Sequence, residues 1–306
     1  MIQSVLDEID KKITEDIQAD ELARMANYST HHFRRVFNEL TGTPFMSYIT
    51  RRKLEYALYD LSQGKKIINV AMDYGFETHA GFTKAFKKYF GYPPSLYRLH
   101  VAASPPLRVT VNNVKTRIGA IRMQVEIKEL TPFSAIGYAS RHKIPGKKSI
   151  ANLPGFYDTA KKDYAAELST LYHTHTQYPH CEIIMCLDVD EEHNCFTYMI
   201  GVGVDKDDFS VPQRPGTYRH ELPGGLYAVF TTPLADDAGQ LAAMQDTWKY
   251  ALEEWIPKSG YAYDETRTDY EYHDERAHSD WRDDRKCCTE IRIPIVNTEP
   301  QLNQFL

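Results

Sequence analysis

The pattern of apolar and polar positions divides the chain into two parts. In the first hundred residues apolar positions recur at helical spacing; VLDEIDKKI, for example, places Val5, Ile9 and Ile13 on one face. After the segment SPPL at 104–107, the period changes to that of strands, as in VEIKEL at 125–130. The pattern therefore predicts a multi-domain protein with an all-α N-terminal part and an α+β C-terminal part.

Within the helical part, a short helix at 21–26 is followed by a turn and a second helix at 30–40. Asn27 lies in the turn, and asparagine tolerates the left-handed backbone conformation better than most residues. Ser29 is a suitable N-cap for the second helix. Two helices joined by so tight a connection form a helix-turn-helix.

The same arrangement recurs after a long helix predicted at about 44–62. Residues 67–76 give a short helix that ends at Gly75, and Thr78 is a suitable cap for a helix at 79–90. The sequence therefore predicts two helix-turn-helix units in one chain. The second helix of each unit has two phenylalanines four positions apart, which face the core: Phe33 and Phe37, and Phe82 and Phe86.

The outer faces of helices 30–40 and 79–90 carry polar and basic side chains that suit DNA. Arginine binds the O6 and N7 edge of guanine with two hydrogen bonds, and lysine and threonine suit phosphates or base edges. Two such helices would enter successive segments of the major groove, about 34 Å apart. The alternative is a helical bundle with a solvated basic surface. The candidates are Thr30, His31, Arg34, Arg35, Thr78, His79, Thr83, Lys84, Lys87 and Lys88.

These motifs resemble the DNA-binding domain of the AraC/XylS family of bacterial transcription regulators. The matching pieces are LARMANYSTHHFRRVF, YITRRKLEYA and INVAMDYGFETHAGFTKAFKKYFGYPPSLYR, in that order within residues 5–100. The short residues Thr78-His79-Ala80-Gly81 stand where close relatives often carry two glutamines, so the second helix is expected to read fewer bases or another site. The resemblance implies base contacts for His31, Arg34, Arg35, His79 and Lys84, and phosphate contacts for Thr30, Thr83, Lys87 and Lys88.

The charge of the chain is divided in the same way as its periodicity. Taken over the whole chain, a net charge of −6 argues against a nucleic-acid partner. Residues 24–100, however, contain 12 Lys or Arg and 5 Asp or Glu, which is +7, and the remainder is therefore −13. Such an asymmetry is typical of a nucleic-acid-binding part joined to a part with another function.

The C-terminal part has the element order strand–helix–strand–strand, twice. The motifs Glu129-Leu130-x-Pro132 and Glu221-Leu222-Pro223 mark the repeat, 92 residues apart. Duplicated βαββ units would form one antiparallel-rich sheet with helices on one side, or a pseudo-two-fold pair with a concave groove at the join, where ligands often bind. A length of 306 residues fits about two domains. We expect them at 1–104 and 122–306, with a linker at 105–121. The elements are strands at 125–130, 181–189, 195–204 and 218–232 (bent at Gly224-Gly225), a terminal strand pair from TDYEYH and CCTEIRIPIV, and helices at 155–172 and 238–256.

Residues 122–297 resemble the GyrI-like effector-binding domain of multidrug-response regulators. The matching pieces are LPGGLYAVF, EEWIPKSGYAY, DYEYH and EIRIPI, in the family's order. The resemblance implies that Glu271, in the penultimate strand, lies in an aromatic pocket and faces cationic, lipophilic ligands. The long polar stretch HDERAHSDWRDDRK departs from the family and leaves the register and any role of Trp281 open.

The residues themselves support an effector site at Glu271. A carboxylate between two tyrosines in a strand would suit an aromatic box, in which each ring attracts a desolvated cation by ~0.5–2 kcal/mol. The alternative is that Glu271 faces solvent and the tyrosines are ordinary strand residues. The expected walls of the box are Tyr270, Tyr272, Tyr227, Trp255 and Tyr261.

Other constellations are not interpreted as sites. His173-x-His175, near His180-Cys181, is expected in a polar connection, because zinc sites need a defined spacing of four ligands. Cys287-Cys288 would point to opposite faces of a strand. No cofactor and no metal are therefore predicted. The odd number of cysteines fits reduced thiols, and no apolar run approaches the ~20 residues of a membrane span, so a cytoplasmic protein is expected.

Together these features predict a bacterial transcription regulator, not an enzyme. Its partners would be duplex DNA, a small cationic or amphipathic effector and RNA polymerase, and the family resemblance favours an activator. Two alternatives remain open. A GyrI-like hydrolase would use Glu271 as a general base, and a protein–protein module would use the C-terminal part to contact a partner directly.

Overall fold

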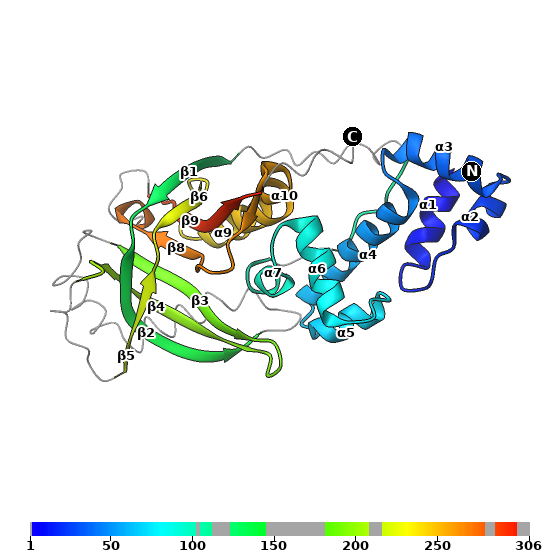
Figure 1. Cartoon of the computed structure of the whole chain (residues 1–306). Helices are drawn as coiled ribbons and strands as arrows, with labels where there is room; N and C mark the ends of the chain where they lie inside the picture. The colour runs from blue at the N-terminus through cyan, green and yellow to red at the C-terminus, as the bar shows by residue number, and fades with distance from the viewer. Residues whose placement is uncertain are drawn as a thin grey trace.

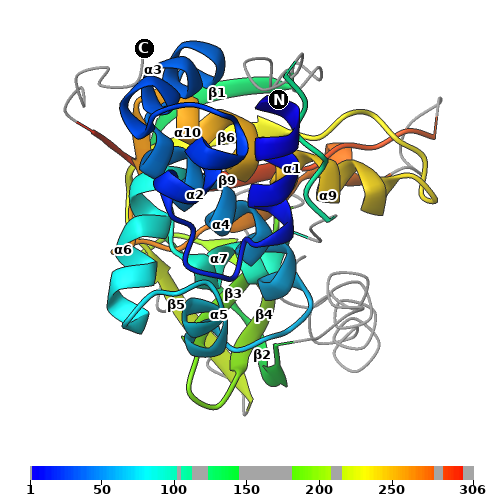
Figure 2. The ribbon, with the colours of Figure 1, turned by 90° about the vertical axis from the view of Figure 1, so that its right-hand side faces the viewer.

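The computed structural model describes residues 2–101, 105–111, 123–144, 181–207, 216–278 and 285–298. A helical part lies at one end of the molecule and a sheet part at the other (Figure 1). Seen along the long direction of the molecule, the helical part lies in front of the sheet (Figure 2). The predicted all-α and α+β parts are both confirmed. The helices of the first part are α1 (Ile2–Lys11), α2 (Ala19–Met25), α3 (Thr30–Thr41), α4 (Phe45–Ser62), α5 (Ile67–Asp73), α6 (His79–Phe90) and α7 (Pro94–His100).

The predicted turn and cap residues start both helices of interest. Ser29 precedes α3, and its hydroxyl accepts a hydrogen bond from the backbone N–H of His32 at 3.3 Å. Thr78 precedes α6 and accepts in the same way from the N–H of Gly81 at 3.0 Å. Asn27 has the left-handed conformation, with φ of 57°. The hydroxyls of Ser29 and Thr78 satisfy backbone donors that have no partner within the helix.

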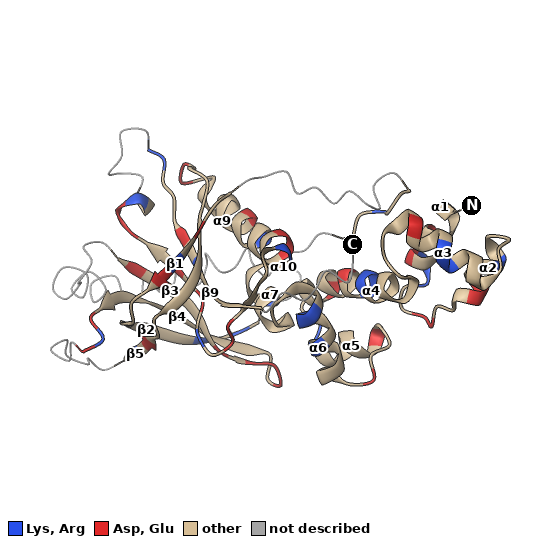
Figure 3. Cartoon of the chain, turned by 45° about the horizontal axis from the view of Figure 1, so that its top comes forward, with Lys and Arg blue, Asp and Glu red and all other residues tan. Residues whose placement is uncertain are grey.

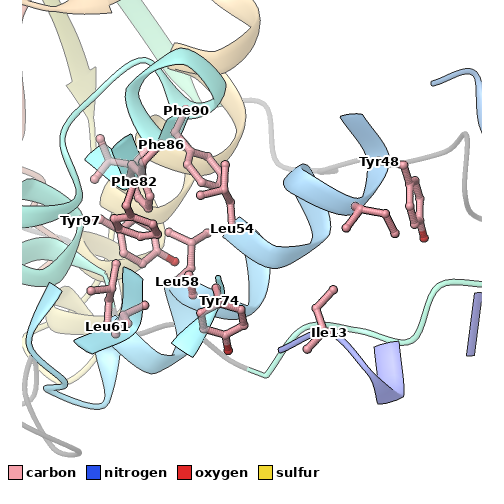
Figure 4. Packing of buried hydrophobic residues seen from close by; sticks show 14 of the residues in the cluster. Ile13, Tyr48, Leu54, Leu58, Leu61, Tyr74, Phe82, Phe86, Phe90 and Tyr97 are labelled. Atoms are coloured by element: carbon pink, nitrogen blue, oxygen red, sulfur yellow. The ribbon is translucent and has the colours of Figure 1, made fainter. Parts of the chain in front are cut away.

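Helix α4 joins the two helix-turn-helix units and fixes their relative orientation. Its side chains Leu54, Leu58 and Leu61 point toward the phenylalanines of α6 and toward Tyr97 of α7 (Figure 4). At its other end, Phe45 packs against the rings of Phe33 and Phe37 of α3. Burial of a Leu or Phe side chain contributes about 1.5–3 kcal/mol. The apolar faces of α3 and α6 are therefore held by one rigid element.

A buried arginine in α4 ties the first helix and the segment after α7 to this frame. Arg52 donates to both carboxylate oxygens of Asp10 at 2.7 and 2.6 Å and to Glu55 at 2.8 Å. It also donates to the carbonyl of Leu107 at 2.8 Å. The start of the predicted linker therefore returns to α1 and α4, where Gln3 donates to its backbone as well.

The sheet part is one antiparallel sheet whose strand order repeats in mirror fashion. The order is β1-β6-β9-β8-β3-β4-β2-β5, and β7 pairs with β9. Strands β8 and β3 meet at the join of the two halves. The strands are β1 (Gln124–Leu130), β2 (Phe133–Lys143), β3 (Glu182–Asp190), β4 (Cys195–Val204), β5 (Thr217–Leu222), β6 (Gly225–Thr231), β7 (Tyr261–Tyr263), β8 (Tyr270–His273) and β9 (Glu290–Asn297).

The predicted duplication is visible in the exchange of the edge strands. Strand β1 pairs with β6 of the second half, and β5 pairs with β2 of the first half. The predicted helix at 238–256 is a continuous helical segment, of which the middle is π-helical: α9 (Gln240–Lys249), η2 (Tyr250–Trp255) and α10 (Ile256–Ser259). The predicted helix at 155–172 lies outside the described residues, as do His173, His175, His180 and Trp281.

Two strands, β2 and the short β7, are absent from the prediction. The first six residues of β2 are all buried, so both of its faces are covered and it has no alternating pattern. Gly137 of β2 lies opposite Gly201 of β4, and a Cβ atom at Gly137 would collide with the carbonyl of Ile200. Glycine is therefore required where the two strands approach closely.

Two negative findings concern the described part of the chain alone. No helix there is both long and apolar enough to cross a membrane. In the same residues no group of three or more His, Cys, Asp or Glu side chains could hold a metal ion. Cys287 and Cys288 are both buried.

Candidate functional site

The outer face of α3 is open. His31, Arg34 and Arg35 are exposed, while Phe33 and Phe37 of the same helix are fully buried. The nearest carboxylate to Arg35 is that of Glu39, one turn away, and this pair is 4.0 Å apart and well exposed. Such a pair contributes little in water and is easily exchanged for a phosphate. The predicted base-reading residues of α3 are therefore presented to solvent.

Thr30, at the start of α3, has a different environment from its neighbours. Its hydroxyl donates to Asp20 of α2 at 2.9 Å. This bond connects the two helices of the first unit. The predicted phosphate contact of Thr30 therefore competes with a contact inside the protein.

The outer face of α6 is partly occupied by the sheet part. His79 Nε2 lies 2.7 Å from a carboxylate oxygen of Glu191, in the turn between β3 and β4. Lys87 Nζ lies 2.6 Å from Glu265, between β7 and β8. Lys84 and Lys88 are exposed. Two of the four basic candidates of α6 thus pair with acidic residues of the sheet part.

The other two candidates of α6 are threonines. Thr78 is the helix cap, so its hydroxyl is held by the backbone N–H of Gly81. The hydroxyl of Thr83 is buried, and it is therefore not placed to reach a phosphate as predicted. Basic residues nevertheless follow α3, α4 and α6 along the helical part (Figure 3).

Glu271 lies in β8, at the join of the two halves of the sheet. Its backbone pairs with Ile184 of β3 on one side and with Ile291 of β9 on the other. The side chain is 18% exposed, and Glu271 Oε2 lies 3.5 Å from Nε2 of His273. Its other oxygen accepts a hydrogen bond from the indole N–H of Trp248 at 3.2 Å. A half-buried carboxylate between apolar strands attracts a cation strongly, because little water screens it.

A thiol on the neighbouring strand feels the same carboxylate. Burial raises the pKa of Cys186 in β3 well above its ordinary value, and the charges of Asp269 and Glu271 raise it further. This thiol therefore stays protonated at neutral pH. Its surroundings are apolar and carry the negative charges of Asp269 and Glu271.

The predicted aromatic box around Glu271 is wrong for Tyr270 and Tyr272. Adjacent residues of a strand point to opposite faces, so these two rings lie on the other face of the sheet. Tyr270 is 1% exposed and packs against Tyr227, with ring centroids 5.8 Å apart. Tyr227 therefore belongs to that opposite face as well. None of these three tyrosines contributes a wall around the carboxylate of Glu271.

The protein's own arginines occupy the faces of these tyrosines. The guanidinium of Arg292 lies 3.5 Å from the ring centre of Tyr272. That of Arg267 lies 4.9 Å from the ring centre of Tyr227. Cation–π contacts do form in this part of the chain, but here they are internal and structural.

Trp255 and Tyr261 lie on the same face of the sheet as Glu271. Their rings stack, with centroids 6.0 Å apart, and Trp255 also packs edge-on against Phe230 of β6. Phe230 pairs with Ile291, which in turn pairs with Glu271, so all three share one face. Both aromatic residues are half-buried. They remain candidate walls, to which the structure adds Trp248, a residue without any distinctive sequence signal.

Two family models match the chain, one for each part. Residues 22–100 match the model described as a helix-turn-helix domain. Residues 126–295 match the model described as an integron-associated effector binding protein. The second match spans more than half of the chain.

Similar characterised proteins match the helical part. The chain is 35% identical over 100 residues to the HTH-type transcriptional activator AarP of Providencia stuartii. The aligned residues make up 32% of this chain and 74% of AarP. The chain is 32% identical over 115 residues to the transcriptional regulator Rob of Salmonella typhimurium. Here the aligned residues make up 36% of this chain and 40% of Rob.

One solved structure that the chain resembles is described as the structure of SAV2435 bound to tetraphenylphosphonium. It is 16% identical to this chain, with a TM-score of 0.42. The likeness covers 57% of this chain and 94% of that one.

Proposed function

Because the chain belongs to the AraC-type transcription regulators and carries an integron-associated, GyrI-like effector-binding domain, we propose that it binds duplex DNA through α3 and α6 and senses a lipophilic cation at Glu271. The proposed DNA-binding domain is 1–104 and the proposed effector-binding domain is 122–306, on either side of a linker at 105–121. Effector binding changes DNA binding or activation only if the effector prefers one of two states of the protein.

The open face of α3 supports the DNA-binding half of this proposal. His31, Arg34 and Arg35, whose side chains suit base edges, lie on the exposed face of the capped helix α3. The opposite face of this helix is buried in the core. A rigid helix that presents arginines from its first turns is the arrangement that reads a major groove. Transcription activation, including contact with RNA polymerase, is proposed from the similarity to AarP, which is described as an activator.

The position of Glu271 is the observation that carries the sensing half. It is a partly buried carboxylate at the join of the two halves, flanked by Ile184 and Ile291 and facing the same side as Trp255. Apolar and aromatic walls recognise the lipophilic part of a ligand, and the carboxylate recognises its charge. This combination favours cations with large apolar groups over small hydrated ones.

Glu271→Gln tests this assignment in the full-length protein. Tetraphenylphosphonium serves as the cationic probe, and an uncharged triphenyl compound of similar size serves as the neutral one. We expect the variant to bind the cation about tenfold more weakly, because the charge attraction is lost, and the neutral probe within about twofold of wild type. Isothermal titration calorimetry measures both.

Glu126→Gln is the matched control, since it removes one carboxylate from the exposed face of β1. Equal losses for both probes in Glu271→Gln would show that this carboxylate is structural.

A further inference from the structure

A buried row of side chains joins Glu271 to the last helix of the DNA-binding part. The indole of Trp248, which donates to Glu271, stacks on His100 with ring centroids 3.7 Å apart and an angle of 13°. His100 Nε2 in turn lies 3.0 Å from a carboxylate oxygen of Asp269. Trp248, His100 and Asp269 are 2%, 4% and 3% exposed. No solvent separates these groups, so a change at one end reaches the other through direct contact.

Both neighbours of the His100 ring belong to the effector-binding domain. Asp269 lies two residues before Glu271 in the chain, and it also accepts a hydrogen bond from the hydroxyl of Tyr263 at 2.8 Å. Trp248 lies near the end of α9. The imidazole of the DNA-binding part is thus held between a carboxylate that is fixed and an indole that contacts the candidate effector residue.

Helix α7, which ends at His100, is shared by the two parts of the molecule. The hydroxyl of Tyr97 donates to Glu253 of η2 at 2.6 Å, and Arg98 donates to Asn194 in the β3–β4 turn at 2.7 Å. On the other side Tyr97 lies in the core with the leucines of α4 and the phenylalanines of α6 (Figure 4). A displacement of α7 therefore changes the support of α6.

We propose that Trp248 is the positioning residue that couples effector binding at Glu271 to DNA binding, an inference that rests on the proposed function. A cation at Glu271 competes with the indole N–H for the carboxylate. A buried donor that loses its acceptor is destabilised by about 1–3 kcal/mol, so the indole reorients to find another. The stacked ring of His100 follows the indole, and α7 follows His100. The coupling is reciprocal, so DNA binding changes the affinity for the effector by the same factor.

Trp248→Phe tests this proposal, because it keeps an aromatic ring for His100 and removes the N–H. DNA affinity of the full-length protein is measured with and without saturating tetraphenylphosphonium, on a duplex recovered by selection from random sequences. We expect the probe to change the affinity of wild type by about fivefold or more. In Trp248→Phe we expect a change within about twofold, while the variant still binds DNA and the probe.

Two further variants guard the interpretation. His100→Asn keeps a polar partner for Asp269 but removes the stacked ring, and it should also abolish the coupling. Tyr250→Phe changes the same helical segment at a ring that packs on Phe230, and it should leave the coupling intact. Coupling that persists in both Trp248→Phe and His100→Asn, or a probe that binds wild type without changing its DNA affinity, overturns the proposal. Failure of wild type to bind the probe overturns the proposed cation sensing instead.

A separate observation concerns the contacts of α6 with the effector-binding domain. The β3–β4 turn contacts the start of the second unit: Glu191 pairs with His79, and the carbonyl of Glu192 accepts from Lys66 at 3.3 Å. At the other end of α6, Glu265 pairs with Lys87. Both paired side chains of α6 belong to residues that the sequence predicts to contact DNA.

We infer that these two glutamates weaken DNA binding through α6. A lysine that is already paired with a carboxylate contributes less to the neutralisation of a phosphate. The carboxylates themselves also repel the DNA backbone. The effector-binding domain thus limits the contribution of the second recognition helix, independently of any ligand.

The double variant Glu191→Gln/Glu265→Gln tests this inference in the full-length protein without a probe. We expect about 3- to 10-fold tighter binding at low salt and a steeper dependence of affinity on salt concentration. Glu126→Gln/Glu129→Gln changes the net charge equally on β1 and is the matched control. Affinity that is unchanged or weaker, or an equal gain in the control, overturns the inference.

Discussion

Helices α3 and α6 are built alike but stand in different surroundings. Each is 12 residues long, starts at a hydroxyl cap and ends at a left-handed glycine. Each buries a pair of phenylalanines four positions apart, and α6 buries Phe90 as well. The outer face of α3 is exposed to solvent, whereas α6 pairs with Glu191 and Glu265 of the effector-binding domain. Similar local sequences thus form similar helices, while the availability of their outer faces depends on what the rest of the chain places against them.

This difference assigns unequal roles to the two helices. With its basic side chains exposed, α3 is expected to provide most of the base recognition. Part of the charge of α6 is already compensated, so we expect it to contribute a weaker contact. The short residues at the start of α6, Thr78 to Gly81, also favour a weaker contact of this helix with DNA bases.

The largest expected effect follows from removing the basic face of α3. Arg34→Ala/Arg35→Ala should weaken binding to a selected duplex by about 100-fold or more, because each bidentate arginine–guanine contact contributes about 1–3 kcal/mol. The slope of affinity against salt should also become flatter. Fluorescence anisotropy at several salt concentrations measures both quantities.

Lys11→Ala/Lys12→Ala, at the C-terminal end of α1, serves as the control for this loss, since it removes the same charge away from α3. Unchanged DNA binding in Arg34→Ala/Arg35→Ala would show that α3 does not recognise DNA.

A smaller effect should distinguish two adjacent lysines of α6. Lys88 is exposed, whereas Lys87 pairs with Glu265. Lys88→Ala should therefore weaken binding by about three- to fivefold and reduce the salt slope by about 1, while Lys87→Ala should change affinity by less than about twofold. Equal losses in the two variants would show that the pair with Glu265 does not limit α6.

The fold could be predicted from the sequence wherever the signals are local. Asn27, Ser29 and Thr78 mark turns and caps by their own chemistry, and the spacing of the phenylalanines marks the inner faces of α3 and α6. Strand β2 could not be predicted in this way. Its first residues are buried on both faces, and its packing depends on Gly201 in another strand.

The surroundings of Glu271, the candidate effector residue, could be predicted only in part from the local sequence. Alternation along β8 already requires that Tyr270 and Tyr272 face away from Glu271, so this error concerned the interpretation of the pattern. The contact of Glu271 with Trp248 and the stacking of Trp248 on His100 have no such signal. His100 and Trp248 are almost 150 positions apart in sequence, and only the folded chain brings them together.

Selection of duplexes from random sequences by the full-length protein tests the unequal roles of the two helices most directly. We predict a site of two segments about one helical turn apart, one with strong base preferences and one with weak preferences. The strong preferences should disappear in Arg34→Ala/Arg35→Ala, and the weak segment should sharpen in Glu191→Gln/Glu265→Gln. Two segments with equally strong preferences in wild type, or strong preferences that survive the arginine substitutions, would contradict the account.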